Sequence, residues 1–234
     1  MAQGPMPRHS FAFPNTPPNY DELANRSALT KILPFLYLGN VHDATVLPVK
    51  HFQDNQISHW INCAREVQMS SAQRALLQKG VISYTSLGMC DTLDENIFVY
   101  LKKAFLIIER ARQESRPCCV YCRCGVSRSA TVVCSYLLWY YSIALDDALR
   151  GLMIRRSCVR PNPSFLAQMV QLEQIKTLVL HPPKESSSAK STPPPSRASS
   201  TQPEDMSIES ASPSPALTTA CKISATLEGV AVLS

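Results

Sequence analysis

The stretch VYCRCGVSRSA, residues 120–130, joins an apolar segment to a run of small residues through a short loop that contains glycine. The segment before it, CCVYC at residues 118–122, predicts a short strand buried on both faces. Residues 127–141 are apolar nearly all round, as expected of a central helix covered by other elements. A buried strand, a tight loop and a buried helix in this order favour the α/β class.

The flanking residues alternate between strand and helix patterns. Strands are predicted at residues 31–39, 57–64 and 81–87, and the helix at residues 70–80 runs from a serine cap to a glycine. Residues 94–112 show one apolar helix face, with Asp94 and Glu95 at the positive end. Two further helices are predicted at residues 145–156 and 164–178. The order predicts an α/β fold with a central, mostly parallel mixed sheet flanked by helices.

The 234 residues include 45% hydrophobic residues, enough for a sizeable core, but their distribution is uneven. Strand-like and helix-like patterns run from about Leu29 to Leu180, whereas both ends are rich in Pro, Ser and Thr. We therefore expect one folded domain at residues 28–180, between a disordered segment at residues 1–27 and a disordered tail at residues 181–234.

Charge and cysteine content narrow the function classes. Between Lys31 and Lys176, 17 basic and 11 acidic residues leave six excess positive charges, which suits an anionic substrate but equally suits ordinary solubility. No basic run indicates nucleic acid, no apolar run reaches the roughly 18 residues of a membrane span, and the N-terminus shows no signal peptide. The odd count of nine cysteines, and the clustering of four of them at residues 118–124, indicate reduced thiols and a cytoplasmic or nuclear location. The oligomeric state stays open.

The spacing Cys122-x5-Arg128 has a chemical logic. A loop of this length turns successive backbone N–H groups into one concavity, and the following helix adds its positive end, so the loop can bind a phosphate. Arg128 can add a bidentate contact, and Cys122 in that field is expected to be a thiolate nucleophile. Gly125 permits an unusual backbone angle, and Ser127 or Ser129 can donate to the thiolate or to loop carbonyls.

The segment CRCGVSRSAT resembles the signature of the cysteine-dependent protein phosphatases, and within them the dual-specificity branch. LTKILPFLYLGN at residues 29–40, CDTLDEN at 90–96 and RRSCVRPNPSFLAQMVQLE at 155–173 are similar to further segments of that family, most of all to the catalytic domain of MAP-kinase phosphatases. The resemblance covers residues 29–178. It implies the cysteine-phosphatase fold and hydrolysis of phosphotyrosine and phosphoserine/threonine on proteins through a phosphocysteine. It also implies no cofactor, and MAP kinases are one candidate substrate.

The resemblance also assigns roles to single residues. Cys122 matches the nucleophile, Arg128 the residue that holds the phosphoryl oxygens, Asp91 the general acid, and Ser129 the hydroxyl that eases departure of the thiolate. The predicted substrate-binding residues are those between nucleophile and arginine: Arg123, Cys124, Gly125, Val126 and Ser127. Taken alone, Asp91 in a polar loop would more often be a turn residue or a helix cap. Its neighbour Asp94 is the rival acid, but its position favours a helix cap.

Three positions depart from the family pattern. Tyr121 stands where the family carries histidine, so we expect lower turnover; the alternative is a weakly active or inactive phosphoprotein-binding module. Ser164 replaces a glycine, which we interpret as a structural variation. Cys124, two residues past the nucleophile, is also unusual and suggests regulation through a disulfide; a C-x-C ring is strained, so Cys119 and Cys90 are alternative partners.

Two other readings are weighed against this one. The thiols Cys118, Cys119, Cys122 and Cys124 could hold zinc, but side chains of a strand alternate between its faces and cannot all converge on one ion. A phosphoinositide or an RNA 5′-phosphate could be the substrate. Relatives of that kind carry Lys or His within the loop, however, and residues 123–127 supply a single arginine, so a phosphoprotein fits better.

Overall fold

The computed structural model describes residues 29–180. The segments predicted to be disordered, residues 1–27 and 181–234, lie outside the described range, and so does residue 28, the first residue of the predicted domain. One sheet contains five strands in the order β1-β2-β5-β3-β4. Strand β1 (Thr30–Leu33) pairs antiparallel with β2 (Leu36–Gly39). Strands β2, β5 (Cys118–Tyr121), β3 (His59–Ala64) and β4 (Ser83–Met89) are mutually parallel. The predicted mostly parallel mixed sheet is confirmed.

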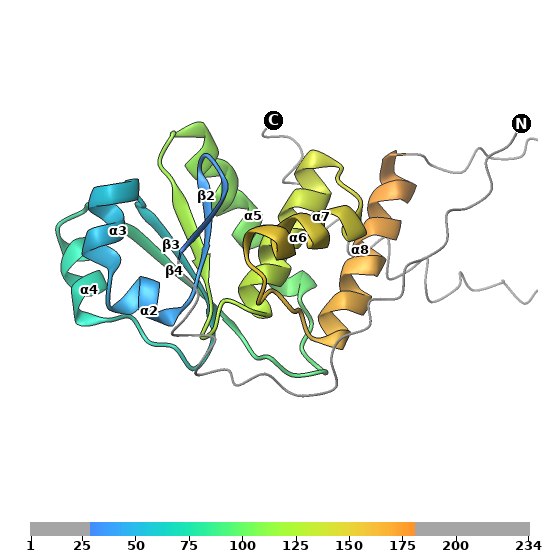
Figure 1. Ribbon diagram of the computed structural model, residues 1–234, viewed down its shortest axis with the longest axis horizontal. Coiled ribbons are helices and arrows are strands. Elements are labelled where there is room, and N and C mark those ends of the chain that lie inside the picture. The colour runs from blue at the N-terminus through green and yellow to red at the C-terminus, as the bar shows by residue number, and fades with distance from the viewer. Residues whose placement is uncertain (1–28, 181–234) are drawn as a thin grey trace, which may run out of the picture.

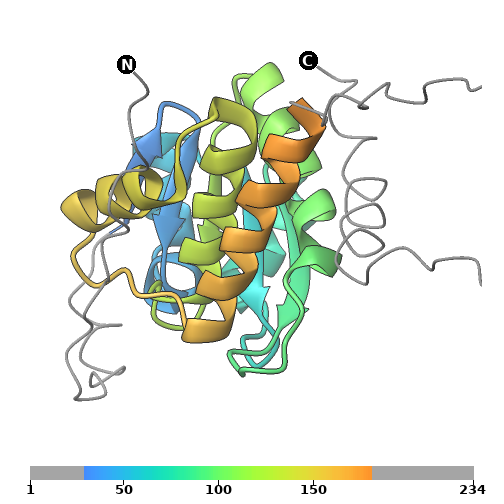
Figure 2. The same cartoon turned by 90° about the vertical axis from the view of Figure 1, so that its right-hand side faces the viewer.

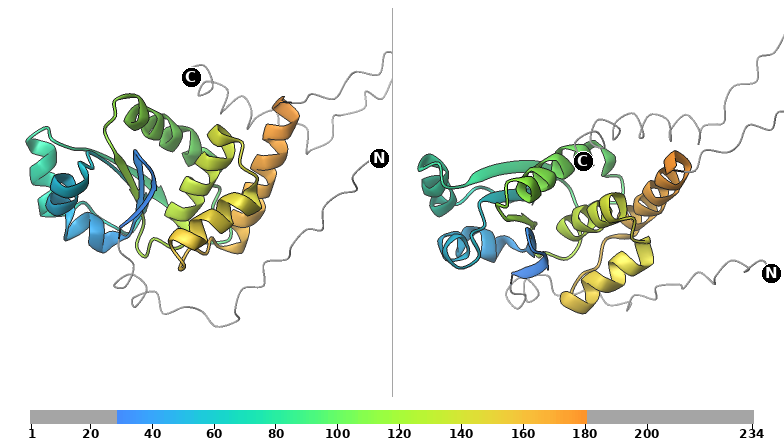
Figure 3. Two further views of the ribbon diagram at one scale, coloured as in Figure 1. Left: turned by 45° about the horizontal axis from the view of Figure 1, so that its top comes forward. Right: turned by 90° about the horizontal axis from the view of Figure 1, so that it is seen from above.

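Helices cover both faces of this sheet, as Figure 1 shows. On one side lie α2 (Val41–Thr45), α3 (Pro48–Asn55) and α4 (Ser71–Gln78). On the other side lie α5 (Phe98–Gln113), α6 (Arg128–Tyr141), α7 (Leu145–Arg155) and α8 (Pro163–Leu180). The view from above in Figure 3 shows the same division into layers. None of the helices within residues 29–180 combines the length and the apolar character that crossing a membrane requires.

Strand β5 supplies side chains to two separate cores, because successive residues of a strand point to opposite faces. Cys118, Val120 and Cys122 belong to the larger core under α5, α6 and α8. Cys119 and Tyr121 belong to the smaller core on the side of α2, α3 and α4. Helix α6 is buried from Arg128 to Leu138 and lies beside α8 (Figure 2), which confirms the predicted central helix.

Two local predictions were wrong, and two helices were not predicted. Residues 31–39 form a hairpin and not one strand, because the chain reverses at Pro34 and the following residue. Residues 41–55, for which no element was predicted, form α2 and α3; a capping box of Asn40 and Asp43 opens α2, and a proline begins α3. Helix α5 begins at Phe98, so Asp94 lies before the helix and does not cap it.

The carboxyl ends of the parallel strands meet at one edge of the sheet, where ligands of open α/β sheets bind. Three loops come together there: residues 65–70 after β3, residues 90–97 after β4, and residues 122–127 between β5 and α6. The loop after β5 carries the sequence-predicted phosphate-binding residues. The two neighbouring loops bring Glu66 and Asp91 to the same edge.

Candidate active site

The 122–128 loop is held from outside by its carbonyl groups. Arg156, at the end of α7, is 4% exposed and donates from Nε to the carbonyl of Gly125 at 2.8 Å and from Nη2 to that of Cys124 at 3.3 Å. The carbonyls that come directly before and after these two also accept hydrogen bonds. The Arg123 carbonyl accepts one from the Val41 N–H at 3.1 Å, and the Val126 carbonyl accepts one from the Arg160 N–H at 2.8 Å. With four successive carbonyls bonded outward, the loop presents its N–H edge to the interior.

Gly125 is the position where the loop demands glycine. Its φ of +67° lies in the left-handed region, and a Cβ there would come within 2.4 Å of Arg156 Nη2 and 2.6 Å of the Gly39 carbonyl oxygen. Any side chain would therefore push against the arginine that braces the loop and against the backbone of β2. The role predicted for this glycine, an unusual backbone angle, is confirmed.

Cys122 lies at the floor of the loop and is 2% exposed. Two donors converge on its sulfur: the backbone N–H of Gly125 and the hydroxyl of Ser129, each at 3.2 Å. Ser129 is the second residue of α6, so the positive end of that helix lies near the sulfur. The sequence left open whether Ser127 or Ser129 serves the thiol, and the structure assigns that contact to Ser129.

Arg128 is buried, and two partners, Glu66 and Met89, hold its terminal nitrogens. Both terminal nitrogens donate to the Glu66 carboxylate in a bidentate pair, Nη1 at 2.6 Å and Nη2 at 2.7 Å. Nη1 also donates to the Met89 carbonyl at 3.2 Å. The hydrogen bond from Arg128 lowers the pKa of Glu66. Burial opposes the charge on Arg128, but the hydrogen bonds to Glu66 and the electrostatic interactions with Cys122, Glu66 and Asp91 together outweigh it and raise the pKa of the guanidinium. Arg128 therefore stays a cation in a fixed orientation.

One nitrogen of Arg128 is not engaged. Within residues 29–180, Nε is buried and has no hydrogen-bond partner; Asp91 Oδ2 lies 3.6 Å from it. A buried unsatisfied donor is costly, so such a group in a folded protein calls for an explanation. This N–H is available for an oxygen of a bound anion.

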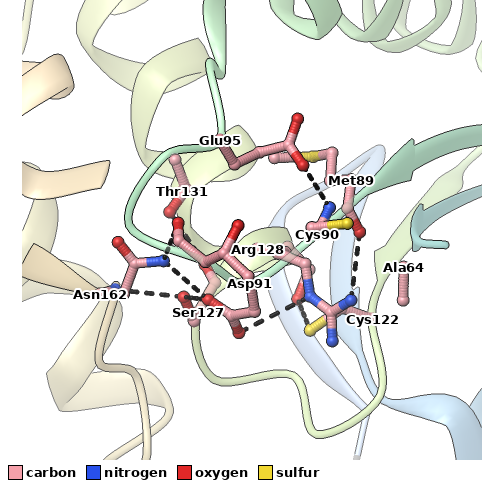
Figure 4. Close-up of polar contacts among 12 residues, drawn as sticks. Ala64, Met89, Cys90, Asp91, Glu95, Cys122, Ser127, Arg128, Thr131 and Asn162 are labelled. Atoms are coloured by element: carbon pink, nitrogen blue, oxygen red, sulfur yellow. Dashed lines mark hydrogen bonds and ion pairs between the residues drawn. The ribbon is translucent and has the colours of Figure 1, made fainter. Parts of the chain in front are cut away.

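Asp91 reaches the 122–128 loop from the loop after β4, and its side chain is 32% exposed. Its Oδ1 accepts hydrogen bonds from Ser127 Oγ at 2.7 Å and from Asn162 Nδ2 at 2.8 Å (Figure 4). The nearby Glu95 has another task, since its carboxylate accepts the backbone N–H of Cys90 at 2.7 Å and the Tyr100 hydroxyl at 2.7 Å. Of the two rival acids, Asp91 contacts Ser127 and Arg128 at the site, whereas Asp94 bonds Thr92 within its own loop.

Tyr121 points away from the sulfur. Its ring lies in the smaller core, edge-on to Trp60 with ring centroids 6.1 Å apart, and its hydroxyl accepts a hydrogen bond from Gln73 of α4 at 3.3 Å. Burial raises the pKa of Tyr121, so the hydroxyl stays neutral. The structure therefore gives the tyrosine a packing role behind the loop.

Three residues that contact the predicted site were not predicted from the sequence: Glu66, Arg156 and Asn162. Glu66 and Arg128 are 62 positions apart in sequence, and Asn162 and Asp91 are 71 apart. A polar residue after a strand is an ordinary loop residue in the sequence, so Glu66 gave no local signal. The position of Asn162 directly before Pro163, a residue typical of a helix start, could have predicted that it caps α8. It gave no indication of a contact with Asp91.

The cysteines do not form a metal site in the described part of the chain, where no group of three or more metal-ligating side chains could hold an ion. Cys118 and Cys119 lie in different cores, as the alternation argument requires. The same alternation puts Cys119 on the opposite sheet face from Cys122. Cys63 lies nearer to Cys122 than Cys119 does. Asn62 of β3 pairs with Tyr121 of β5, so the next residues, Cys63 and Cys122, are neighbours, and both belong to the larger core. Regulation by oxidation stays a prediction.

Comparison with known families gives a match over most of the described residues. The family model described as "Dual specificity phosphatase, catalytic domain" matches residues 36–175. The matched range includes four of the five strands, β2 to β5. It also contains every predicted catalytic residue: Asp91, Cys122, Arg128 and Ser129.

Among curated proteins, human Protein phosphatase Slingshot homolog 3 is 32% identical over 155 residues, which is 66% of this chain and 22% of that protein. Mouse Dual specificity protein phosphatase 22 is 29% identical over 148 residues, which is 63% of this chain and 75% of that protein. The chain thus spans about a fifth of the length of the Slingshot relative. Among solved structures, that of DUSP15 has a TM-score of 0.54 at 30% identity, covering 63% of this chain and 86% of that one.

Proposed function

The chain belongs to the dual-specificity phosphatase family, and on that premise we propose that it hydrolyses phosphotyrosine and phosphoserine/threonine on proteins through a phosphocysteine at Cys122. That it is a protein phosphatase follows from the family. The observation that carries the proposed mechanism is the convergence of two donors, Gly125 N–H and Ser129 Oγ, on one buried sulfur. Donors to sulfur favour a thiolate, which is the nucleophilic form of cysteine.

In the first step the Cys122 thiolate attacks phosphorus and takes the phosphoryl group. The loop N–H groups of residues 123–127 and the unengaged Nε–H of Arg128 would bind the phosphoryl oxygens. Glu66 and Met89 hold the other side of the guanidinium, so the arginine needs little rearrangement when substrate binds. This preorganisation favours the transition state, in which the oxygens carry most charge.

The leaving oxygen of the tyrosine, serine or threonine needs a proton as the P–O bond breaks. Asp91 is the proposed general acid because it reaches the loop and stands 3.6 Å from Arg128 Nε, next to the place where phosphate would sit. After the dephosphorylated protein leaves, the same carboxylate can accept a proton from the water that attacks the phosphocysteine. Asp91 thereby serves as acid in one step and base in the next.

Breakdown of the phosphocysteine returns the electron pair of the S–P bond to sulfur. Ser129 donates to that sulfur at 3.2 Å and would stabilise the departing thiolate. The inward-facing N–H of Gly125 assists from the loop side. No metal or organic cofactor is needed for this cycle, since a thiolate, an arginine and a carboxylate supply every proton and charge that it requires.

The protein substrate is a separate matter. MAP kinases remain one candidate from the sequence pattern, and the compared relatives are Slingshot and dual-specificity phosphatase 22 proteins. Phosphoproteins as a class follow from the family. A cytoplasmic or nuclear location is also proposed, supported by reduced thiols at six positions: Cys63, Cys90, Cys118, Cys119, Cys122 and Cys134.

The proposal is tested with a panel of phosphopeptides that contains phosphotyrosine, phosphoserine, phosphothreonine, and singly and doubly phosphorylated T-x-Y sequences. Wild type should release phosphate from phosphotyrosine and from at least one of the other two residues, Asp91→Ala much more slowly, and Cys122→Ser not at all. If wild type is as inert as Cys122→Ser on the whole panel, the proposed activity is wrong. Preference for doubly phosphorylated T-x-Y peptides would support MAP kinases as substrates.

A further inference from the structure

Asn162 closes a ring of hydrogen bonds that joins three segments at the site. Its backbone N–H donates to Ser127 Oγ at 3.1 Å, Ser127 Oγ donates to Asp91 Oδ1 at 2.7 Å, and Asn162 Nδ2 donates to the same Oδ1 at 2.8 Å. Figure 4 shows the three side chains side by side. The ring connects the start of α8, the 122–128 loop and the loop after β4.

The amide of Asn162 has only one orientation that satisfies its neighbours. Its Oδ1 accepts the backbone N–H of Phe165 at 2.9 Å and so caps α8, while Nδ2 faces the carboxylate of Asp91. Reversing the amide would turn an oxygen toward the carboxylate and an NH₂ group toward a backbone donor. The cap of α8 therefore fixes the donor that bonds Asp91.

The ring leaves the two oxygens of Asp91 in different situations. Oδ1 is held by two donors, whereas Oδ2 faces Arg128 Nε at 3.6 Å. In the proposed first step the S–P bond forms, the P–O bond breaks with its electron pair on the leaving oxygen, and that oxygen takes the proton of Asp91. With Oδ1 occupied, Oδ2 is the oxygen that carries this proton, and it lies beside the phosphate-binding edge of Arg128.

We propose that Asn162 is a positioning residue for the general acid: it holds the Asp91 carboxyl so that Oδ2 faces the leaving oxygen. This inference rests on the proposed function, because it assumes that Asp91 is the acid. Asn162 acts through Asp91 and does not itself touch the reacting atoms. Its loss should therefore matter in proportion to how much the leaving group needs a proton.

The test uses the dependence of rate on leaving group. Wild type, Asp91→Ala and Asn162→Ser are assayed for kcat/KM, which reports the steps up to departure of the leaving group, on a series of aryl phosphates of graded leaving-group acidity and on a phosphoserine peptide. Serine is a good helix cap, so Asn162→Ser keeps the start of α8 and removes the Nδ2 donor. We expect kcat/KM on the phosphoserine peptide to fall about tenfold, part of the roughly 100-fold or more that loss of a general acid costs, and to fall less as the leaving group becomes more acidic.

Two controls separate positioning from a structural effect. Lys176→Met removes the contacts of α8 with the end of α6, where Nζ donates to the Leu138 carbonyl at 2.6 Å and to Ser142 Oγ at 2.9 Å, far along α8 from Asn162. It disturbs the docking of α8 without changing the ring, so any loss of rate should be the same for every leaving group. The double variant Asp91→Ala/Asn162→Ser should be no slower than Asp91→Ala alone.

The outcomes distinguish the inference from the function on which it rests. If Asn162→Ser slows all leaving groups equally, slows none, or adds fully to Asp91→Ala, Asn162 does not position the acid. If wild type is inert, or if Asp91→Ala shows no leaving-group dependence, the proposed function fails at the acid itself and the inference falls with it. A leaving-group slope in Asn162→Ser that lies between wild type and Asp91→Ala supports the inference.

Discussion

Gly125→Ala should both inactivate the protein and destabilise it by more than an ordinary glycine substitution. The new methyl group would lie 2.4 Å from Arg156 Nη2 and 2.6 Å from the Gly39 carbonyl oxygen. The carbonyl belongs to β2 and cannot withdraw without disturbing the sheet. Arg156 must therefore shift, and it would give up its bonds to the carbonyls of Gly125 and Cys124.

A matched variant isolates this clash from the cost of the backbone angle. Gly80 ends α4 with a φ of +68°, close to the +67° of Gly125, and a Cβ there meets no atom within 4 Å. Gly80→Ala should cost only the about 1–2 kcal/mol of a left-handed residue with a side chain. Gly125→Ala should also lose the hydrogen bonds from the charged Arg156, each worth about 1.5–3 kcal/mol. Its free energy of unfolding should therefore fall by about 3 kcal/mol more than that of Gly80→Ala.

Urea unfolding measures the stability of both variants, and hydrolysis of a fluorogenic aryl phosphate measures kcat/KM. Because the N–H of Gly125 donates to Cys122 Sγ at 3.2 Å, a displaced loop should lower kcat/KM by about 100-fold or more in Gly125→Ala, against less than about twofold in Gly80→Ala. If Gly125→Ala is no less stable than Gly80→Ala, or if it keeps kcat/KM within a few fold of wild type, the reasoning about the braced loop is wrong.

Three further predictions concern the neighbours of the loop. Tyr121→Phe should cost about 1 kcal/mol of stability in urea unfolding yet change kcat/KM by less than about twofold, since its hydroxyl faces the other core; a tenfold loss of activity would contradict this. The bond from Arg128 lowers the pKa of Glu66, so the pair stabilises the fold above the range where a free Glu titrates and is lost as pH falls through the lowered pKa. Glu66→Gln should flatten the fall of the urea midpoint between about pH 6 and pH 3, and an unchanged slope would refute it. Ser129→Ala, which removes a donor to Cys122, should give a burst of product followed by slow turnover in rapid mixing, and uniform slowing without a burst would argue against its role.

Much of the fold could be predicted because its signals are local. The strands and the buried central helix follow from apolar patterns, and the C-x5-R spacing places a cysteine and an arginine at the two ends of one loop. The predicted acid, Asp91, also lies at the site, 3.6 Å from Arg128. The failures have local causes too: Pro34 turned a nine-residue apolar run into a hairpin, and the two helices at residues 41–55 are short, so their apolar faces are hard to recognise.

The residues that complete the site could not be predicted, because their roles depend on tertiary contacts. Glu66 bonds Arg128 only after β3 and β5 pair in parallel, and Asn162 meets Asp91 only after α8 docks beside α6. Tyr121 shows the opposite case. It sits next to Cys122 in sequence, but strand alternation puts its side chain on the other face of the sheet. Neighbours in sequence along a strand are thus separated, whereas distant residues meet.

The central claim is that phosphate passes through the sulfur of Cys122. Ser129→Ala, in which breakdown of the intermediate should be slow, can be mixed with a phosphotyrosine peptide, quenched within the first turnover, digested and mapped by mass spectrometry. The account predicts one added phosphoryl group on the peptide that contains Cys122, and none when Cys122→Ser is treated in the same way. A phosphoryl group on another residue, or product release at the wild-type rate by Cys122→Ser, would contradict it.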